Sequence, residues 1–179
     1  MAKIGLFYGS NEGHTEQVAQ RIKTEFDDYE ADVVEVFNIA HCTAADILAW
    51  DYLIFGIPTW NNGLLQDDWD IFFPNLDQVD LSGKKVAIFG LGDQYLYSVT
   101  FLDAVGVLGR KVRERGGELL GYWPDDDYEI ADSAALEDGM FMGLAIDQDN
   151  EADKTGERIE AWVLQLVQEF ALFEVEPAL

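Results

Sequence analysis

Short apolar runs alternate with stretches of helical periodicity along most of the chain. The runs that predict strands are Lys3–Tyr8, Asp32–Phe37, Tyr52–Ile57, Lys85–Gly90 and the segment that begins at Glu118–Trp123. Runs of this length that are apolar without alternation are typical of parallel strands covered by helices on both faces. The pattern therefore predicts an α/β fold, a three-layer sandwich with a parallel sheet as its middle layer.

Apolar residues between these runs recur at the spacing of an amphipathic helix. The predicted helices are Gly13–Phe26, a short one from the candidate N-cap Thr43 through Trp50, Phe101–Glu114 and Thr155–Phe170. Gly116 and Gly117 form a plausible stop for the third of these helices. The residues that follow Phe170 are expected to fray, as chain ends commonly do.

The alternation of strands and helices breaks once, in residues 124–140. Pro124–Met140 is acidic and rich in turn-forming residues, and an apolar strand pattern resumes at Phe141–Ile146. Because strand-like segments flank it closely, this stretch is interpreted as an excursion inside the fifth strand and not as a linker. Residues 1–179 are accordingly predicted to form a single domain.

Three loops, each directly after an apolar run, carry the candidate chemistry. In the first, residues 9–15, Ser10 and Thr15 provide hydroxyls, and a helix start provides backbone N–H groups that can hold an anion without a cation. His14 occupies the place where a nucleotide P-loop has lysine. Taken alone, this loop fits a capped helix start as well as a phosphate site.

The other two loops each contain a large aromatic ring in polar surroundings. Trp60 lies in Pro58–Gly63 and Tyr97 in Gly92–Tyr97. Each ring could fold back onto the core or stack on a planar ligand. Because ligands of open α/β sheets bind at the carboxyl ends of the strands, all three loops are expected to form one pocket. Such a pocket would take a ligand with a phosphate at one end and a flat ring at the other.

The charge balance limits the possible partners. Eleven Lys and Arg residues against thirty-five Asp and Glu residues give a net charge of −24 and a pI near 4.1. Such a field repels nucleic acid and anionic membranes, so neither is expected as a partner. Either a highly solvated surface or a surface that steers the protein onto basic partners fits this composition, and composition does not separate the two.

Other sequence features indicate a cytoplasmic protein. No apolar run is long enough to span a bilayer, and the first strand begins at once, which leaves no room for a secretory signal. The single cysteine, Cys42, fits a reducing compartment and is interpreted as a buried apolar side chain.

No metal site is predicted. Asp147–Glu151 resembles the start of a calcium loop, but Ala152 replaces the turn glycine and Arg158 stands where the bidentate glutamate belongs. The two histidines, His14 and His41, are too few and too far apart in sequence to suggest a metal centre.

The motifs taken together resemble the flavodoxin family, in particular its long-chain members. The segments that carry the resemblance are Phe7–Thr15, Gly56–Asn61, Gly90–Gln94 with Tyr97, and Gly143–Asn150. The resemblance covers nearly the whole chain. It implies a five-stranded parallel sheet in the order 2-1-3-4-5, non-covalently bound FMN, and a long-chain insertion at residues 124–140.

The resemblance also implies roles for individual residues. Trp60 and Tyr97 would sandwich the flavin ring, Asp93 would bind its pyrimidine end, and Asp149 would contact the ribityl chain. The expected phosphate loop consists of Ser10, Asn11, Glu12, Gly13, His14 and Thr15. The expected ring loops also supply Pro58, Thr59, Asn61, Asn62, Gly63 and Gly92. Glu12 stands where the family usually has threonine, and its side chain is expected to point outward; an inward carboxylate should weaken FMN binding.

The function implied by the resemblance is a low-potential one-electron carrier, not an enzyme. It would cycle between FMN semiquinone and hydroquinone and dock transiently, as a monomer, on basic redox partners. The peptide between Asn61 and Asn62 is expected to flip on reduction, and Asn62 is expected to make this easier because Asn tolerates positive φ. The alternative is an FMN-dependent quinone reductase, which would need substrate room over the ring that Tyr97 would occupy. A receiver-type signalling module is excluded because its clustered aspartates are missing from the strand ends.

Overall fold

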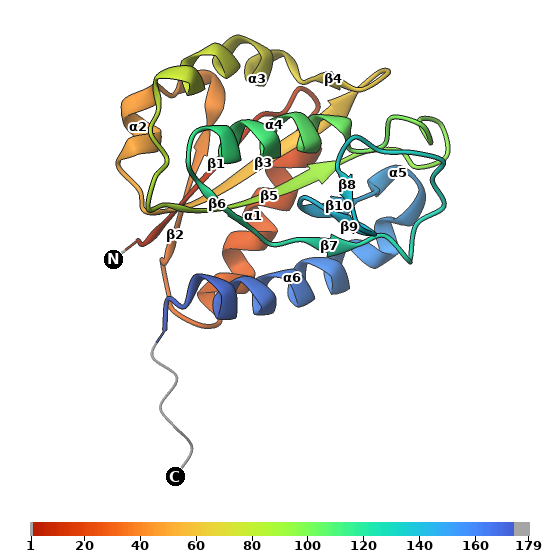
Figure 1. Cartoon of the computed structure of the whole chain (residues 1–179). Helices are drawn as coiled ribbons and strands as arrows, with labels where there is room; N and C mark the ends of the chain where they lie inside the picture. The colour runs from red at the N-terminus through yellow and green to blue at the C-terminus, as the bar shows by residue number, and fades with distance from the viewer. Residues whose placement is uncertain (1, 174–179) are drawn as a thin grey trace.

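The computed structural model describes residues 2–173 and has a parallel sheet as its central layer (Figure 1). The order of the main strands is β10-β5-β3-β1-β2, with β6 also paired to β5 and the short β4 antiparallel to β3. The strands are β1 (Ile4–Tyr8), β2 (Val34–Asn38), β3 (Tyr52–Trp60), β4 (Leu64–Leu65), β5 (Lys85–Leu91), β6 (Glu118–Leu120) and β10 (Leu144–Ile146). The predicted α/β class and strand order are confirmed.

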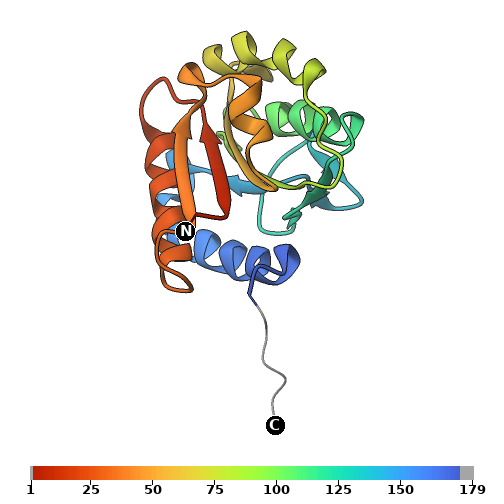
Figure 2. The ribbon, with the colours of Figure 1, turned by 90° about the vertical axis from the view of Figure 1, so that its left-hand side faces the viewer.

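The sheet is buried on both faces, as the unbroken apolar runs predicted. Successive residues of β1 alternate between the two core clusters: Leu6 faces one and Phe7 faces the other, and neither side chain is exposed to solvent. The helices α1 (His14–Asp27) and α6 (Thr155–Phe170) cover the first face. The opposite face is covered by α2 (Ala44–Leu48), α3 (Asp67–Phe72) and α4 (Asp103–Glu114). The three layers are visible in the view of Figure 2.

The excursion in the fifth strand forms a small sheet of its own. After β6 the chain builds β7 (Trp123–Pro124), β8 (Leu136–Glu137) and β9 (Met140–Phe141), antiparallel in the order β7-β9-β8. It then returns to the main sheet as β10. Because β6 and β10 both pair in parallel with β5, the two pieces share one position in the sheet. The predicted strand segments Glu118–Trp123 and Phe141–Ile146 extend too far toward this excursion, since β6 ends at Leu120 and β10 begins at Leu144.

Several elements differ from the sequence-based prediction. No element was predicted between Gly63 and Lys85, where the structure has β4, α3 and the 3₁₀ helix η2 (Phe73–Gln78). Three further short helices were also missed: η1 (Ile39–His41), α5 (Gln148–Glu151) and η3 (Ala152–Lys154). The helix α4 begins at Asp103 and not at Phe101, because Leu102 adopts a left-handed conformation (φ 60°) just before it.

The end of the described chain packs against the body of the protein. Ala171 ends α6 in a left-handed conformation. Phe173 stacks with Tyr29, and the Lys3 ammonium lies 5.2 Å from the centre of the Phe173 ring. The expected fraying after Phe170 thus does not hold for residues 171–173, and residues 174–179 lie outside the described part of the chain. No helix in residues 2–173 is long and apolar enough to cross a membrane.

Candidate functional site

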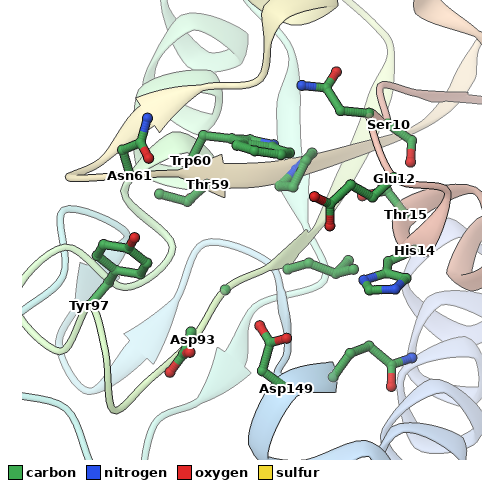
Figure 3. A pocket seen from close by; sticks show the side chains of 15 residues that line it. Ser10, Glu12, His14, Thr15, Thr59, Trp60, Asn61, Asp93, Tyr97 and Asp149 are labelled. Atoms are coloured by element: carbon green, nitrogen blue, oxygen red, sulfur yellow. The ribbon is translucent and has the colours of Figure 1, made fainter.

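The loops after β1, β3 and β5 meet at one pocket, together with the start of α5 (Figure 3). The pocket has an empty volume of about 790 Å³, including its open mouth. Its walls are Ser10, Asn11, Glu12, His14, Thr15, Pro58, Thr59, Trp60, Asn61, Leu91, Gly92, Asp93, Tyr97, Gln148 and Asp149. Most of the residues predicted from the sequence are therefore brought together.

A few positions differ from the predicted set. Gly13, Asn62 and Gly63 belong to the same loops but do not line the pocket, whereas Leu91 and Gln148 line it without having been predicted. Leu91 is the last residue of β5 and Gln148 directly precedes the predicted Asp149. Position alone could have indicated both of them, since ligands bind where strands end.

One end of the pocket is suited to an anion. The loop turns into α1 through Gly13, whose φ of 87° is left-handed, and Ser10 Oγ accepts a hydrogen bond from Gly13 N at 2.9 Å. The N–H groups of His14 and Thr15 lie in the first turn of α1, where the helix itself supplies no acceptor. These N–H groups and the positive end of the helix can bind a phosphate without a lysine or arginine.

Gln66, which is fully buried, holds this loop in place. Its Nε2 donates to Asn11 Oδ1 at 2.7 Å, and its Oε1 accepts from Trp69 N at 3.2 Å to cap α3. A Cβ atom on Gly9 would lie 2.1 Å from Gln66 Oε1, so only glycine allows this close approach. Gln66, the N-cap of α3, thus anchors the loop of residues 9–15, and α3 was not predicted from the sequence.

Two aromatic rings border the other end of the pocket. Trp60 is the last residue of β3, and Tyr97 lies in the loop after β5; both are half-buried (Figure 3). Within residues 2–173 neither ring stacks on another aromatic ring. Two half-buried rings without aromatic partners at one pocket suit a planar ligand.

Asp93 lines the pocket, and hydrogen bonds fix the orientation of its carboxylate. Its Oδ1 accepts from Leu96 N at 2.8 Å, Tyr95 N at 3.1 Å and Asn150 Nδ2 at 2.8 Å, whereas Oδ2 has no partner among the described residues. Partial burial would raise the pKa of Asp93, but these hydrogen bonds outweigh burial and lower the pKa. Asp93 is therefore an ionised acceptor held in a fixed orientation, which suits a ring N–H.

The charge of the pocket is strongly negative. Glu12, Asp93 and Asp149 line it, and among residues 2–173 His14 is the only lining residue that can carry a positive charge. Partial burial raises the pKa of Asp149, and so do the neighbouring carboxylates Asp93 and Asp147. The field therefore opposes further negative charge.

Glu12 differs from the sequence-based expectation. Its side chain was expected to point outward, but it lines the pocket, and its carboxylate extends over the cavity (Figure 3). Glu12 is exposed and lies two residues before α1. Within residues 2–173 no hydrogen bond to the backbone fixes its side chain in this orientation. A phosphate bound by the loop of residues 9–15 would therefore lie near the Glu12 carboxylate.

The stretch that resembles a calcium loop has another role. Asp147 caps α5, accepting from Asn150 N at 3.1 Å, and Glu151 forms an ion pair with Arg158 at 2.8 Å. Within residues 2–173 no group of three or more His, Cys, Asp and Glu side chains could hold a metal ion.

Comparison with known proteins decides the family. A sequence model described as Flavodoxin matches residues 6–162. The chain belongs to the flavodoxin family. A flavodoxin of Nostoc sp. (strain PCC 7120) is 49% identical to this flavodoxin over 170 residues, which cover 95% of this chain and 98% of the relative. The flavodoxin of Synechococcus elongatus is 48% identical over 172 residues, 96% of this chain and 100% of that protein.

Solved flavodoxin structures have the same architecture. A Fusobacterium nucleatum flavodoxin bound to flavin mononucleotide superimposes on this flavodoxin with a TM-score of 0.88 at 28% identity, covering 94% of this chain and 99% of that one. Its K13G mutant, also bound to flavin mononucleotide, gives a TM-score of 0.87 with 93% and 95% coverage.

Proposed function

We propose that this flavodoxin is a low-potential electron carrier that binds FMN non-covalently and passes one electron at a time between redox proteins. FMN is the cofactor, and the protein transfers electrons without converting a substrate of its own. The observation that carries the proposal is the convergence of three strand ends on one pocket, with free helix N–H groups at one end and two unstacked rings at the other. When bound, FMN supplies the redox chemistry, and the protein sets its orientation and potential.

Each part of the pocket suits one part of FMN. Ser10 and the N–H groups at the start of α1 would hold the phosphate, and Trp60 and Tyr97 would flank the ring. Asp93 Oδ2 would accept a hydrogen bond from a ring N–H, and Asp149, which lines the pocket, would contact the ribityl chain. The other proposed contacts are Asn11, Glu12, Gly13, His14, Thr15, Pro58, Thr59, Asn61, Asn62, Gly63 and Gly92.

An apolar rim near the ring loops supports transient docking. Leu64, Tyr95, Leu96 and Val99 are each more than half exposed, in a chain of net charge −24. Exposed apolar side chains set in an acidic surface fit basic redox proteins, because opposite charges speed the encounter and a small apolar contact allows fast release. The proposal includes a monomeric state, a cytoplasmic location and no nucleic-acid or membrane partner.

The split fifth strand supports assignment to the long-chain branch. The stretch between β6 and β10 holds a three-stranded sheet of its own, and the whole chain is proposed to be one FMN-binding domain.

A visible spectrum during stepwise reduction tests the proposed function. Purified protein, or protein reconstituted with FMN, should be yellow and should take up two electrons in separate one-electron steps. Size-exclusion chromatography and an assay of NAD(P)H oxidation with quinone are the controls. A colourless protein that does not bind added FMN would contradict the proposal, and an oligomer with rapid quinone turnover would favour a quinone reductase.

A further inference from the structure

Gln94 follows the pocket residue Asp93, and its side chain is completely buried. The amide Nε2 donates to Asp147 Oδ2 at 2.9 Å and also to Glu151, while Oε1 accepts from Glu129 N at 2.9 Å. A single side chain thus bonds to the start of α5 and to the inserted segment between β7 and β8, while its own backbone belongs to the loop after β5.

An ion cluster around the buried Arg158 extends this connection. Arg158, which is 5% exposed, bonds through Nη2 to Glu151 Oε2 at 2.8 Å and to Asp127 Oδ2 at 2.9 Å. Its guanidinium lies 4.3 Å from the ring centre of Tyr128, and Lys154 pairs with both carboxylates. Contacts therefore run without a break from the inserted segment through Glu151 to Gln94.

The same loop is bonded to the inserted segment at two further points. Ser98 O accepts from Ala131 N at 2.8 Å and from Asp132 N at 3.0 Å, and Ser133 Oγ donates to Phe101 O. The loop that carries Asp93 and Tyr97 is therefore held along its length, and Gln94 is its point of attachment to the inserted segment closest in sequence to Asp93.

We propose that Gln94 is a positioning residue that fixes Asp93 and Tyr97 at the pocket through its bonds to Asp147, Glu151 and the inserted segment. This inference rests on the proposed FMN-binding function. Buried amides with all partners satisfied are rigid, whereas an apolar replacement would remove one donor from each of two carboxylates and leave the Glu129 N–H without its acceptor. The loop would then sample positions in which Asp93 Oδ2 and the Tyr97 ring lie away from the ligand.

The first test measures the loop without FMN. In ligand-free protein, Gln94→Met should speed hydrogen exchange of the Tyr95 and Leu96 amides, which donate to Asp93 Oδ1 in the intact loop. The matched control is Gln165→Met on α6. Gln165 also bridges two groups, Tyr122 O at 3.0 Å and Glu169 Oε1 at 2.9 Å, but neither belongs to this loop. Exchange at Tyr95 and Leu96 should stay unchanged in the control.

The second test measures the loaded protein. Gln94→Met should raise the dissociation constant of FMN about tenfold, in line with the loss of buried hydrogen bonds beside a ligand. It should also raise the midpoint potential of the second electron, because a freed Asp93 carboxylate can move away from the reduced, negatively charged ring. Gln165→Met should leave both values unchanged.

Asp127→Asn is a second variant in case Gln94→Met fails to fold. The Asp127 side chain is 60% exposed, so this substitution should leave folding intact. It should change the same three quantities in the same direction but less. Unchanged amide exchange at Tyr95 and Leu96 in both Gln94→Met and Asp127→Asn would overturn the inference. Failure of the unsubstituted protein to bind FMN would instead refute the proposed function, and the exchange measurement would still test the positioning role.

Discussion

Asn150 Nδ2 lies 2.8 Å from Asp93 Oδ1, and the same amide is 3.0 Å from Asp147 Oδ2. One exposed side chain therefore connects Asp147, the N-cap of α5, to the carboxylate of the pocket residue Asp93. Because Asp93 Oδ1 also accepts two backbone N–H groups, the bond from Asn150 is the contact in this group that a side-chain substitution can remove.

Asn150→Ala should raise the pKa of Asp93 and weaken FMN binding several-fold. The folded pKa of Asp93 lies below its unfolded value, so these bonds stabilise the fold above about pH 3.9 and are lost as the pH falls through the folded pKa. The variant should therefore lose stability at neutral pH, by about 1 kcal/mol, and little in acid. Urea unfolding from pH 7 to pH 3 checks this; an equal loss at both ends would contradict it.

Glu12→Gln should bind FMN more tightly, because it removes a carboxylate that extends over the pocket. One unit charge about 10 Å from another costs about 1.7 kcal/mol at an effective dielectric constant of about 20, before salt screening. Fluorescence titration should show a several-fold lower dissociation constant for FMN and little change for riboflavin, which lacks the phosphate. Glu16→Gln is the control, since Glu16 lies on α1 and does not line the pocket. Equal gains for both ligands would rule out phosphate repulsion.

Asn61→Val should destabilise the protein by about 1–2 kcal/mol, because Asn61 has a φ of 47° and branched residues are strained in the left-handed region. In the described conformation Asn61, and not Asn62, has a positive φ; the positive φ expected of Asn62 belongs to the peptide flip on reduction and stays a prediction. Asn62→Val should therefore be nearly neutral in the same urea-unfolding experiment, and Asn61→Gly should be tolerated. A larger loss in Asn62→Val than in Asn61→Val would refute this.

Raising the ionic strength should raise the midpoint potential of the second electron. Three lining carboxylates and a net charge of −24 disfavour the additional negative charge of reduced flavin, and salt screens this repulsion. Spectroelectrochemical titration between low salt and about 1 M salt measures the shift, since the Debye length falls to about 3 Å at that concentration. A potential that does not change with salt would show that distant carboxylates contribute nothing.

The main sheet and the convergence of the three loops were predictable because both follow from local patterns. Unbroken apolar runs mark β1, β3 and β5, and the carboxyl ends of parallel strands lie together whatever the rest of the chain does. The boundaries of β6 and β10 were less predictable, because Tyr122 and Phe141 are apolar yet lie between these two strands, outside the main sheet.

The missed features depend on contacts between distant segments. Helix α3 has six residues, too few to show a helical period, and its only buried positions are Trp69 and Phe72. Nothing in the sequence distinguishes Gln66 from other polar residues, because only the fold brings it beside Asn11. The orientation of Glu12 could not be predicted either, because an exposed side chain before a helix has several allowed rotamers.

The division of the fifth strand makes one edge of the sheet tolerant of change. Lys85–Ala87 pairs with β6 and Phe89–Leu91 with β10, so either half keeps its partners however long the intervening chain becomes. Shortening that segment would spare the hydrogen-bond ladder yet delete Glu129, whose N–H meets Gln94. The segment between β6 and β10 can thus change in length during evolution. Such a change would affect the surroundings of the cofactor and leave the strand pairing of β5 intact.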